Sequence, residues 1–327
     1  MRKLIEIQNT NSRILKINYD LGNVCNYKCW YCYPEANTGT VYWPDVNVVK
    51  KNIVKLINFY IDKKIVDEVQ LSLLGGEPSL WKELGEFAEY VSKNSQCKIY
   101  LITNGSRTIR WWEEYARYFD SINISIHHEK VDLDHIEKLA KVLYDQNICF
   151  FADVLMDHLA WDKCLGIVER LCSSKTKFMV LAKPIHITGE TFYNDEQRKY
   201  LQTHVKRYPA LKTFFKYRKQ FLNISTITAV FEGNKKIKTK NEHYFIVNVL
   251  NNFKGWQCNL GINFMFIDRY GNLSGTCKQK LFGLDHYYNI NDKEFENKFS
   301  PENIIPVICE QTLCLCSGET ALIKRKI

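Results

Sequence analysis

The sequence lacks any run of about 18 consecutive apolar residues, the minimum for a helix that crosses a membrane. Its N-terminus, Met-Arg-Lys-Leu-Ile-Glu-Ile-Gln-Asn, also lacks the apolar core of a secretory signal peptide. Internal repeats and low-complexity segments are missing as well. We therefore expect a cytoplasmic protein that has no membrane partner.

A strong compositional bias is absent too. Hydrophobic residues make up 46% of the 327 residues and charged residues 25%, which excludes disorder, collagen and coiled coil as the main state. The 45 basic residues outnumber the 36 acidic ones, for a net charge of +9. Because the basic residues are dispersed, this charge favours an anionic partner only weakly, and we do not expect nucleic acid.

Short β-rich runs alternate with helical patterns from residue 14 to about residue 186. Such strands form a parallel open sheet or barrel, and their carboxyl ends make the functional edge. A helix is expected around Val49–Ile61, with Asp45 as its N-cap, and further helices at 108–119, 133–146 and 161–172. The expected strands are Ile14–Asp20, Val69–Leu74, Lys98–Thr103, Ser121–Ile126, Ile148–Leu155 and Phe178–Ile185.

The pattern changes after about residue 190. We expect one more helix at Asn194–Val205, then two strands, Ile224–Phe231 and Tyr244–Val249, around a turn at 232–234. A second hairpin is expected at 263–277. These changes predict a barrel domain at residues 1–205, a connecting helix and hairpin region at 206–250, and a small α+β domain at 251–327.

Twelve cysteines in a cytoplasmic protein indicate metal binding or catalysis rather than disulfides. Three of them, Cys25, Cys29 and Cys32, follow the first expected strand with C-x3-C-x2-C spacing. Three thiolates on one loop can hold a [4Fe-4S] cluster and leave one iron open for a substrate or cofactor. A zinc knuckle is the alternative, but zinc needs a fourth ligand and none follows nearby.

The spacing of these cysteines resembles the signature of the radical SAM superfamily, and the aromatic Tyr31 before the last cysteine fits it. Gly75-Gly76-Glu77-Pro78, at the end of the second expected strand, is similar to the GGE motif of that family. The resemblance implies that the backbone and the acid of this motif hold the methionyl amine of S-adenosylmethionine (SAM). Glycines allow close approach of the backbone, and a carboxylate pairs with an ammonium group.

Further residues at strand ends fit the family. Asn104, in Thr103-Asn104-Gly105, resembles the TNG after the third strand, and Ser125 lies where relatives contact the methionyl or ribose part of SAM. His127 follows the fourth strand and Asp153 interrupts an apolar strand, so both are candidates for a substrate contact or an acid–base group. Each residue has an alternative explanation. Asn104 can be a turn residue and Ser125 a serine on the strand face. His127 can belong to a polar loop, and Asp153 can make a strand-end hydrogen bond.

A second group of cysteines lies near the C-terminus. Cys258 and Cys277 bracket the second expected hairpin, and Cys309, Cys314 and Cys316 follow. This arrangement looks like the twitch domain, a shortened SPASM domain that carries an auxiliary [4Fe-4S] cluster. The resemblance implies four ligands and one spare thiol, which is a substitute ligand or a hydrogen-atom donor to a substrate radical. We assign the spare place to Cys309. Structural zinc is the alternative, because a four-cysteine zinc site also suits a hairpin followed by a knuckle.

The resemblance as a whole implies a partial (β/α)6 radical SAM barrel followed by a small α+β twitch-like domain with a cluster-bearing hairpin. It implies two [4Fe-4S] clusters, one SAM-binding and one auxiliary, and a flavodoxin- or ferredoxin-type electron donor. The implied reaction is reductive cleavage of SAM to a 5′-deoxyadenosyl radical, which abstracts hydrogen from the substrate.

Three functions remain open. The first, which we prefer, is modification of a peptide by epimerisation, crosslinking or oxidation, as twitch and SPASM relatives often perform. The second is dehydrogenation, epimerisation or cyclisation of a small polar or phosphorylated metabolite, which the positive net charge mildly favours. The third is a non-enzymatic iron–sulfur redox sensor, which does not cleave SAM.

Overall fold

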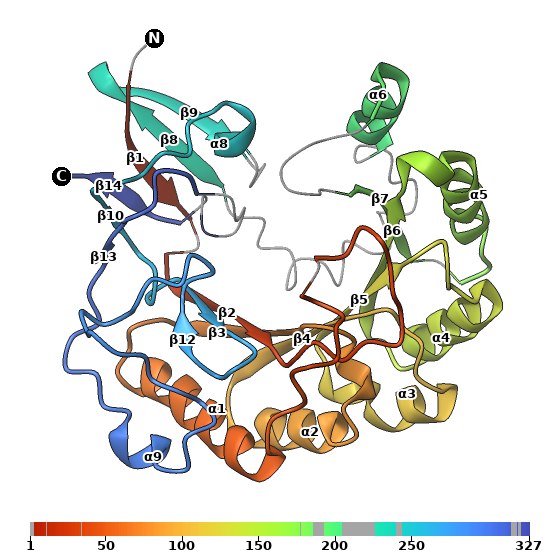
Figure 1. The fold of residues 1–327 in the computed structure, drawn as a ribbon, viewed down its shortest axis with the longest axis horizontal. Helices are drawn as coiled ribbons and strands as arrows, with labels where there is room; N and C mark the ends of the chain where they lie inside the picture. The colour runs from red at the N-terminus through yellow and green to blue at the C-terminus, as the bar shows by residue number, and fades with distance from the viewer. Residues whose placement is uncertain are drawn as a thin grey trace.

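The computed structural model describes residues 3–10, 12–33, 35–176, 178–185, 193–204, 226–239, 244–314, 319 and 322–327. Within these ranges the chain forms two β-sheets, one of eight strands and one of six. The larger sheet carries helices along one face, and the smaller sheet lies to one side together with both chain ends (Figure 1). None of the described helices is long and apolar enough to cross a membrane.

Six strands of the larger sheet, β2 to β7, run parallel and in chain order. This arrangement confirms the α/β class and the parallel sheet that the sequence predicts. The strands are β2 (Ile14–Asp20), β3 (Glu68–Leu74), β4 (Cys97–Thr103), β5 (Ser121–Ile126), β6 (Cys149–Met156) and β7 (Met179–Pro184).

Helices connect these strands and cover one face of the sheet (Figure 1). They are α1 (Val46–Asp62), α2 (Leu84–Asn94), α3 (Ile109–Tyr115), α4 (Leu133–Asp145) and α5 (Trp161–Cys172), with α6 (Asp195–His204) after β7. Short 3-10 helices are η1 (Pro78–Leu80), η2 (Ala116–Tyr118), η3 (His158–Ala160) and η4 (Glu232–Asn234).

Helix α1 shows how the local sequence forms these elements. Val49, Ile53 and Leu56 follow the helical period, and all three are completely buried against the sheet. The carboxylate of Asp45 accepts a hydrogen bond from the backbone N–H of Asn47 at 2.9 Å. This contact confirms the expected N-cap and satisfies one of the free amides of the first turn.

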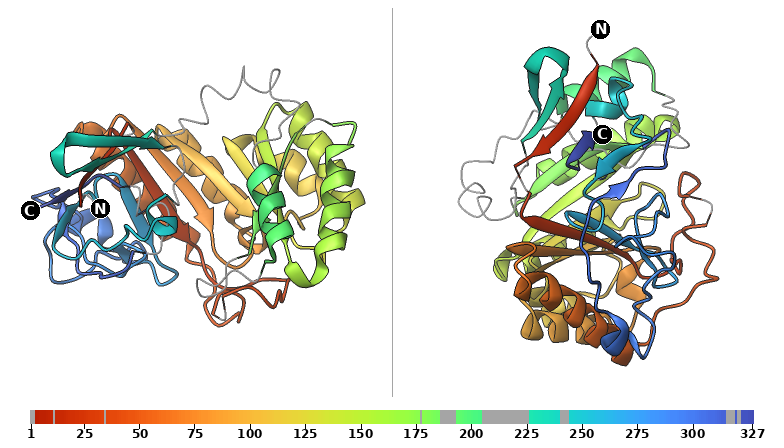
Figure 2. Two further views of the ribbon diagram at one scale, coloured as in Figure 1. Left: turned by 90° about the horizontal axis from the view of Figure 1, so that it is seen from above. Right: turned by 90° about the vertical axis from the view of Figure 1, so that its left-hand side faces the viewer.

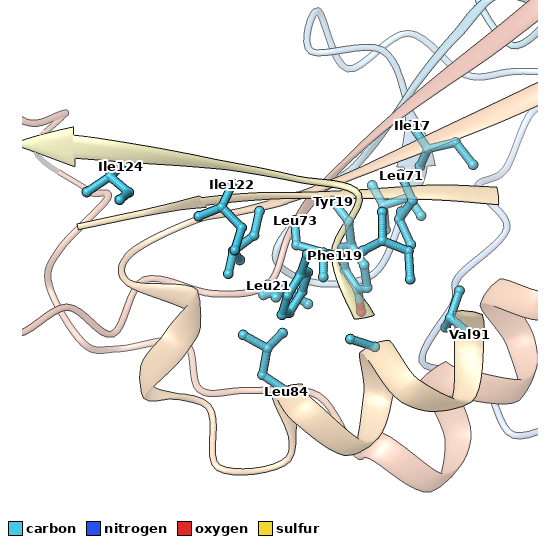
Figure 3. Close-up of a cluster of buried hydrophobic side chains, with 14 of the residues drawn as sticks. Ile17, Tyr19, Leu21, Leu71, Leu73, Leu84, Val91, Phe119, Ile122 and Ile124 are labelled. Atoms are coloured by element: carbon cyan, nitrogen blue, oxygen red, sulfur yellow. The ribbon is translucent and has the colours of Figure 1, made fainter. Parts of the chain in front are cut away.

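The hydrophobic core lies between the parallel sheet and its helices (Figure 3). Leu71 and Leu73 of β3 point into it, together with Leu84 of α2 and Phe119 at the end of η2. Each fully buried side chain of this size contributes about 1.5–3 kcal/mol. Because side chains alternate along a strand, the residues between these lie on the opposite face of the sheet, where a site can form.

The smaller sheet is antiparallel, with the strand order β13-β10-β14-β1-β8-β9. The first strand of the chain pairs antiparallel with the last one, so segments from both ends of the chain lie in the same sheet (Figure 2). The strands are β1 (Leu4–Asn9), β8 (Ile227–Phe231), β9 (Lys235–Thr239), β10 (Trp256–Cys258), β13 (Val307–Ile308) and β14 (Lys324–Lys326). Residues 4–9 therefore belong with C-terminal strands, whereas the sequence pattern groups them with the barrel.

The C-terminal part also extends the larger sheet. Strand β11 (Phe264–Ile267) pairs parallel with β2, and β12 (Leu273–Ser274) pairs antiparallel with β11. Two short helices, α8 (Tyr244–Val247) and α9 (Phe295–Lys298), lie in the same part of the chain. The hairpin that the sequence predicts at 263–277 is thus joined directly to the first strand of the barrel.

One expected strand is wrong. The sequence pattern predicts a strand at Tyr244–Val249, but Tyr244–Val247 forms helix α8, and β8 pairs with β9 instead. Gly233 and Asn234 have positive φ angles of 73° and 59°, so the chain reverses tightly and the residues directly after the turn become the partner. Strand β9 is rich in lysine, which is typical of an edge strand. The lysines obscure the alternation of apolar and polar residues by which a strand is recognised in the sequence.

Candidate functional site

The cysteines of the C-x3-C-x2-C motif lie on the loop after β2, at the carboxyl edge of the parallel sheet. Cys29 is buried, and Cys25 and Cys32 are partly exposed. Burial raises the pKa of all three thiols, that of Cys29 to about 12. The charge of Cys32 adds to this rise at both Cys25 and Cys29, so the three sulfurs lie close together.

These thiols fit a [4Fe-4S] cluster. Cys29 and Cys32 pack against Tyr27, Tyr31 and Ile185, which gives the sulfurs a largely apolar surrounding. In the described part of the chain, no three His, Cys, Asp or Glu side chains are gathered to hold a metal ion. A cluster binds each thiolate through a different iron, so its thiols need not converge on one point. Three thiols on one loop are the donor set of a [4Fe-4S] cluster that keeps one iron open.

The buried side chain of Asn23 closes the segment that carries the cysteines. Its amide donates to the carbonyl oxygen of Glu35 at 3.0 Å and to the hydroxyls of Thr38 and Thr40 at 2.7 and 3.1 Å. Its carbonyl oxygen accepts from the backbone N–H of Val41 at 2.7 Å. One side chain thus holds the two ends of a long irregular loop together.

Asp157 holds the same loop from the opposite side. It follows β6, and its carboxylate accepts hydrogen bonds from the indole of Trp30 at 2.8 Å and the backbone of Leu159 at 2.9 Å. His128 Nε2 lies 3.0 Å from the same carboxylate. The sequence pattern points to His128, which follows the fourth expected strand together with His127, but not to Asp157. The signal that could have found Asp157 is an acid directly after a strand, at the functional edge.

The motif Gly75-Gly76-Glu77-Pro78 packs against the start of the cysteine loop. A β-carbon on Gly75 would stand 2.3 Å from Asp20 Oδ1, and one on Gly76 would stand 2.2 Å from the carbonyl oxygen of Val24. The backbone N–H of Glu77 donates to that carbonyl oxygen at 2.8 Å. Only glycine permits so close an approach, and Pro78 then starts η1.

Glu77 is 1% exposed and joins the segments that follow β3 and β4. Its carboxylate accepts hydrogen bonds from the hydroxyl of Thr103 and the backbone of Asn104, each at 2.5 Å, and from the backbone of Ser79 at 3.0 Å. Burial raises the pKa of Glu77, and these donors oppose the rise. Its charge also raises the pKa of Cys25, so this carboxylate lies near the first cysteine.

Ser125 and Asp153 are register partners on β5 and β6. Asp153 is 2% exposed, and its Oδ2 accepts from the amide of Asn123 at 3.1 Å and the ammonium of Lys183 at 2.9 Å. Its Oδ1 has no hydrogen-bond partner among the described residues. The sequence analysis does not name Lys183. The sequence signal that could have identified Lys183 is its position on β7. It alternates there with core residues and therefore faces away from the helices.

His127 lies against the cysteine loop. Its Nδ1 is 3.3 Å from Cys29 Sγ and 3.0 Å from the hydroxyl of Tyr31. The Tyr31 ring stacks on the imidazole with centroids 5.8 Å apart, and Tyr27 meets it edge-on at 5.7 Å. Burial, and the neighbouring His128, lower the pKa of His127 to about 4, so the ring is neutral near pH 7.

Four cysteines of the C-terminal part are near enough to interact electrostatically, although no three described His, Cys, Asp or Glu side chains converge on one metal-ion position. Burial raises the pKa of Cys277 to about 11 and that of Cys314 to about 12, and it raises the pKa of Cys309. The charge of Cys258 adds to the rise in each case. The sequence analysis expects Cys316 as the fourth ligand and Cys309 as its substitute; Cys316 lies outside the described residues.

Two buried charged residues flank this second group of thiols. Lys324 is 1% exposed, donates to the carbonyl oxygen of Glu319, and lies 4.9 Å from the ring centroid of Phe253. Its charge lowers the pKa of Cys309 and Cys314, whereas the Glu319 carboxylate raises both. A lysine is almost never fully buried without a negative partner. Ionised thiols would supply that partner here.

Comparisons with known proteins match the part of the chain that carries the first group of cysteines. Residues 19–141 match the model of the Radical SAM superfamily. An S-adenosylmethionine-dependent nucleotide dehydratase of Fibrobacter sp. (strain UWH6) is 29% identical over 116 residues, which cover 36% of this chain and 34% of that protein. GTP 3',8-cyclase of Pasteurella multocida (strain Pm70) is 30% identical over 121 residues, which cover 35% of this chain and 33% of that protein.

The matched stretch spans about a third of the length of these curated relatives. Among solved structures, native anSMEcpe with bound AdoMet is similar with a TM-score of 0.49. Its sequence is 17% identical, and the similarity covers 89% of this chain and 82% of that one.

Proposed function

We propose that this chain, whose residues 19–141 form a radical SAM domain, reductively cleaves SAM to a 5′-deoxyadenosyl radical that abstracts hydrogen from a bound substrate. The meeting of Cys25, Glu77 and Asn104 at one edge of the sheet carries the proposal. An iron–sulfur cluster with an open iron supplies the electron for that cleavage when it is bound. The protein contributes the three thiols, the buried carboxylate of Glu77 and a glycine backbone that packs closely against the cysteine loop.

The residues divide the task of binding. The thiols of Cys25, Cys29 and Cys32 would hold the cluster, and the buried carboxylate of Glu77 attracts the methionyl ammonium group of SAM. Gly75 and Gly76 let the backbone of this motif pack directly against the start of the cysteine loop. We assign the remaining contacts to SAM to Tyr31, Pro78, Asn104 and Ser125.

We propose a nucleotide, or another small phosphorylated metabolite, as the substrate. Two relatives are named for reactions of nucleotides. On the sheet face opposite the helices, the side chain of Lys183 is 57% exposed and available to a phosphate, beside the buried acceptor Asp153. Peptide modification, which the sequence analysis prefers, stays a prediction that none of the described contacts favours.

We also propose an auxiliary [4Fe-4S] cluster held by Cys258, Cys277, Cys309 and Cys314. The mutual effect of these thiols on their pKa values supports the proposal, and so does the buried ammonium of Lys324 beside them. Iron and zinc analysis of the purified protein separates this cluster from structural zinc. An electron donor of flavodoxin or ferredoxin type, and a cytoplasmic location where thiols stay reduced, belong to the same proposal.

Formation of 5′-deoxyadenosine tests the central proposal. Anaerobically reconstituted full-length protein, given SAM and a strong reductant, should form it, and Cys29→Ala should abolish it. Cys172→Ala is the matched control, because Cys172 is exposed at the end of α5, away from the thiols of both groups. Wild-type protein that carries about four or more irons but forms no 5′-deoxyadenosine would contradict the proposal and favour the redox sensor.

A panel of nucleoside triphosphates and short peptides tests the substrate. A nucleotide that raises the rate of 5′-deoxyadenosine formation and is itself converted supports the proposed class. A peptide that does so, with no effect of any nucleotide, would return the assignment to peptide modification.

A further inference from the structure

The three cysteines of the first group receive different kinds of hydrogen-bond donor. The sulfur of Cys25 accepts from the backbone N–H of Tyr27 at 3.3 Å, and that of Cys32 has a backbone donor at Tyr33. Cys29 instead faces two side chains, the imidazole of His127 at 3.3 Å and the hydroxyl of Tyr31. Within the described part of the loop, Cys29 is therefore the cysteine whose hydrogen-bond donors a side-chain substitution can remove.

The protonation of these groups follows from the ligand itself. A cluster-bound thiolate carries no hydrogen, so Cys29 Sγ can only accept. His127 can bond to that sulfur only through an N–H on Nδ1, the ring nitrogen 3.3 Å from Cys29 Sγ. The Tyr31 hydroxyl, 3.0 Å from Nδ1, is then left to accept from His127 or to turn its own proton toward Cys29.

The imidazole is held firmly in this place. Its residue comes directly after β5, and its ring is stacked on Tyr31 at an interplanar angle of 8° and met edge-on by Tyr27 at 85°. Both tyrosines belong to the cysteine loop. Two aromatic contacts from the loop and one strand end from the barrel thus fix Nδ1 beside one ligand.

We propose that His127, supported by Tyr31, sets the reduction potential of the SAM-binding cluster through the hydrogen bond to Cys29 Sγ. This role rests on the proposed function, since it requires Cys29 to be a cluster ligand. Hydrogen bonds to the sulfurs of an iron–sulfur cluster are among the factors that determine its potential. A donor stabilises the reduced, more negative cluster, so it raises the potential and eases reduction by the electron donor. His127 is a positioning and tuning residue in this role, not an acid or base.

A redox titration followed by EPR tests the proposal on anaerobically reconstituted full-length protein. It is read on the signal that Cys29→Ala removes, so an auxiliary centre does not interfere. His127→Phe keeps a flat ring and removes the donor, and its midpoint potential should fall by about 60 mV, a tenfold change in the reduction equilibrium constant. His127→Asn places an amide N–H near the position of Nδ1 and should restore most of that loss.

Two further variants complete the design. Tyr31→Phe should lower the potential in the same direction, and it keeps the test decisive where His127→Phe does not fold. His286→Phe, at an exposed histidine of the C-terminal part, should leave the potential unchanged.

A His127→Phe protein with full iron content and an unchanged midpoint would overturn the proposal. An Asn variant that shifts as far as the Phe variant would also overturn it, because the effect would then come from packing alone. A failure of the proposed function has a different signature: the EPR signal then does not respond to SAM, whatever the midpoints of the variants.

Discussion

Arg269 binds Asp20 and so ties the C-terminal hairpin to the barrel sheet. Its Nε and Nη2 lie 3.1 and 3.0 Å from Asp20 Oδ2. Its Nη1 donates at 2.7 Å to the carbonyl oxygen of Glu35, which also accepts from Asn23. Asp20 ends β2, and Glu35 follows Cys32 in the chain. One guanidinium thus connects the segment before the three cysteines to the segment after them.

Removal of this guanidinium should destabilise the protein. Asp20 is 6% exposed, and breaking a buried ion pair by removing one partner costs about 3–5 kcal/mol. Burial raises the pKa of Asp20 in spite of Arg269, so the unpaired carboxylate is the source of the cost. Chemical unfolding should therefore show a large decrease in the free energy of unfolding for Arg269→Met. The double variant Asp20→Asn/Arg269→Met should recover part of that free energy. Equal stability of the single variant and the wild type would contradict this view.

Glu77→Gln should weaken SAM binding about tenfold or more, measured by calorimetry on the reconstituted protein. Hydrogen bonds to a charged group contribute about 1.5–3 kcal/mol, and glutamine keeps the shape but not the charge. Because both oxygens of Glu77 accept from buried donors, the amide N–H of glutamine would face one of them, so the unfolding of Glu77→Gln is measured alongside its affinity. Glu113→Gln, on the exposed side of α3, is the control. An unchanged affinity in Glu77→Gln would remove this residue from the SAM site.

Lys183→Met should raise the KM for a nucleotide substrate about tenfold or more. The ammonium group of Lys183 is half-exposed beside Asp153, and a phosphate contact with it would be charge-assisted. Steady-state kinetics with the nucleotide that stimulates 5′-deoxyadenosine formation measures the effect. Lys163→Met, at an exposed lysine of α5, should leave KM unchanged. The same KM in both variants would exclude Lys183 from phosphate binding.

Lys324→Met should reduce the iron content of the reconstituted protein from about eight to about four atoms per chain. The buried ammonium offsets the negative charge of the C-terminal thiolates, and without it the auxiliary cluster loses its countercharge. Lys326→Met, at an exposed position of the same strand, is the control. Iron and sulfide analysis decides the matter, and full iron in Lys324→Met would argue against the role of this lysine.

Local patterns predict much of the barrel. The strand runs and the Asp45 cap depend on residues only a few positions apart, and the structure has them as expected. The same reasoning misses α2, although Leu84, Phe87, Ala88 and Val91 recur at helical spacing and are completely buried. It is wrong at Tyr244–Val249, where an apolar run fits a strand and a helix equally well and packing decides.

The same local patterns do not predict contacts between distant segments of the chain. Trp30 and Asp157 are 127 positions apart, and Asp153 meets Lys183 from a neighbouring strand. Cys309 joins the other C-terminal cysteines only because β13 pairs with β10, which carries Cys258. The first two partnerships have no spacing that could be recognised along the chain, whereas the sequence already groups Cys309 with Cys258 as a possible ligand.

Local patterns are enough to locate the parallel strands along the chain and the residues at their carboxyl ends, because periodicity and the steric need for Gly75 and Gly76 depend on neighbouring residues. The tertiary structure alone decided that β1 joins the last strand, that Lys324 is buried among the C-terminal thiols, and that His127 faces Cys29. These outcomes depend on which distant surfaces pack together, and packing is a property of the whole fold, since each contact is formed only when the others are.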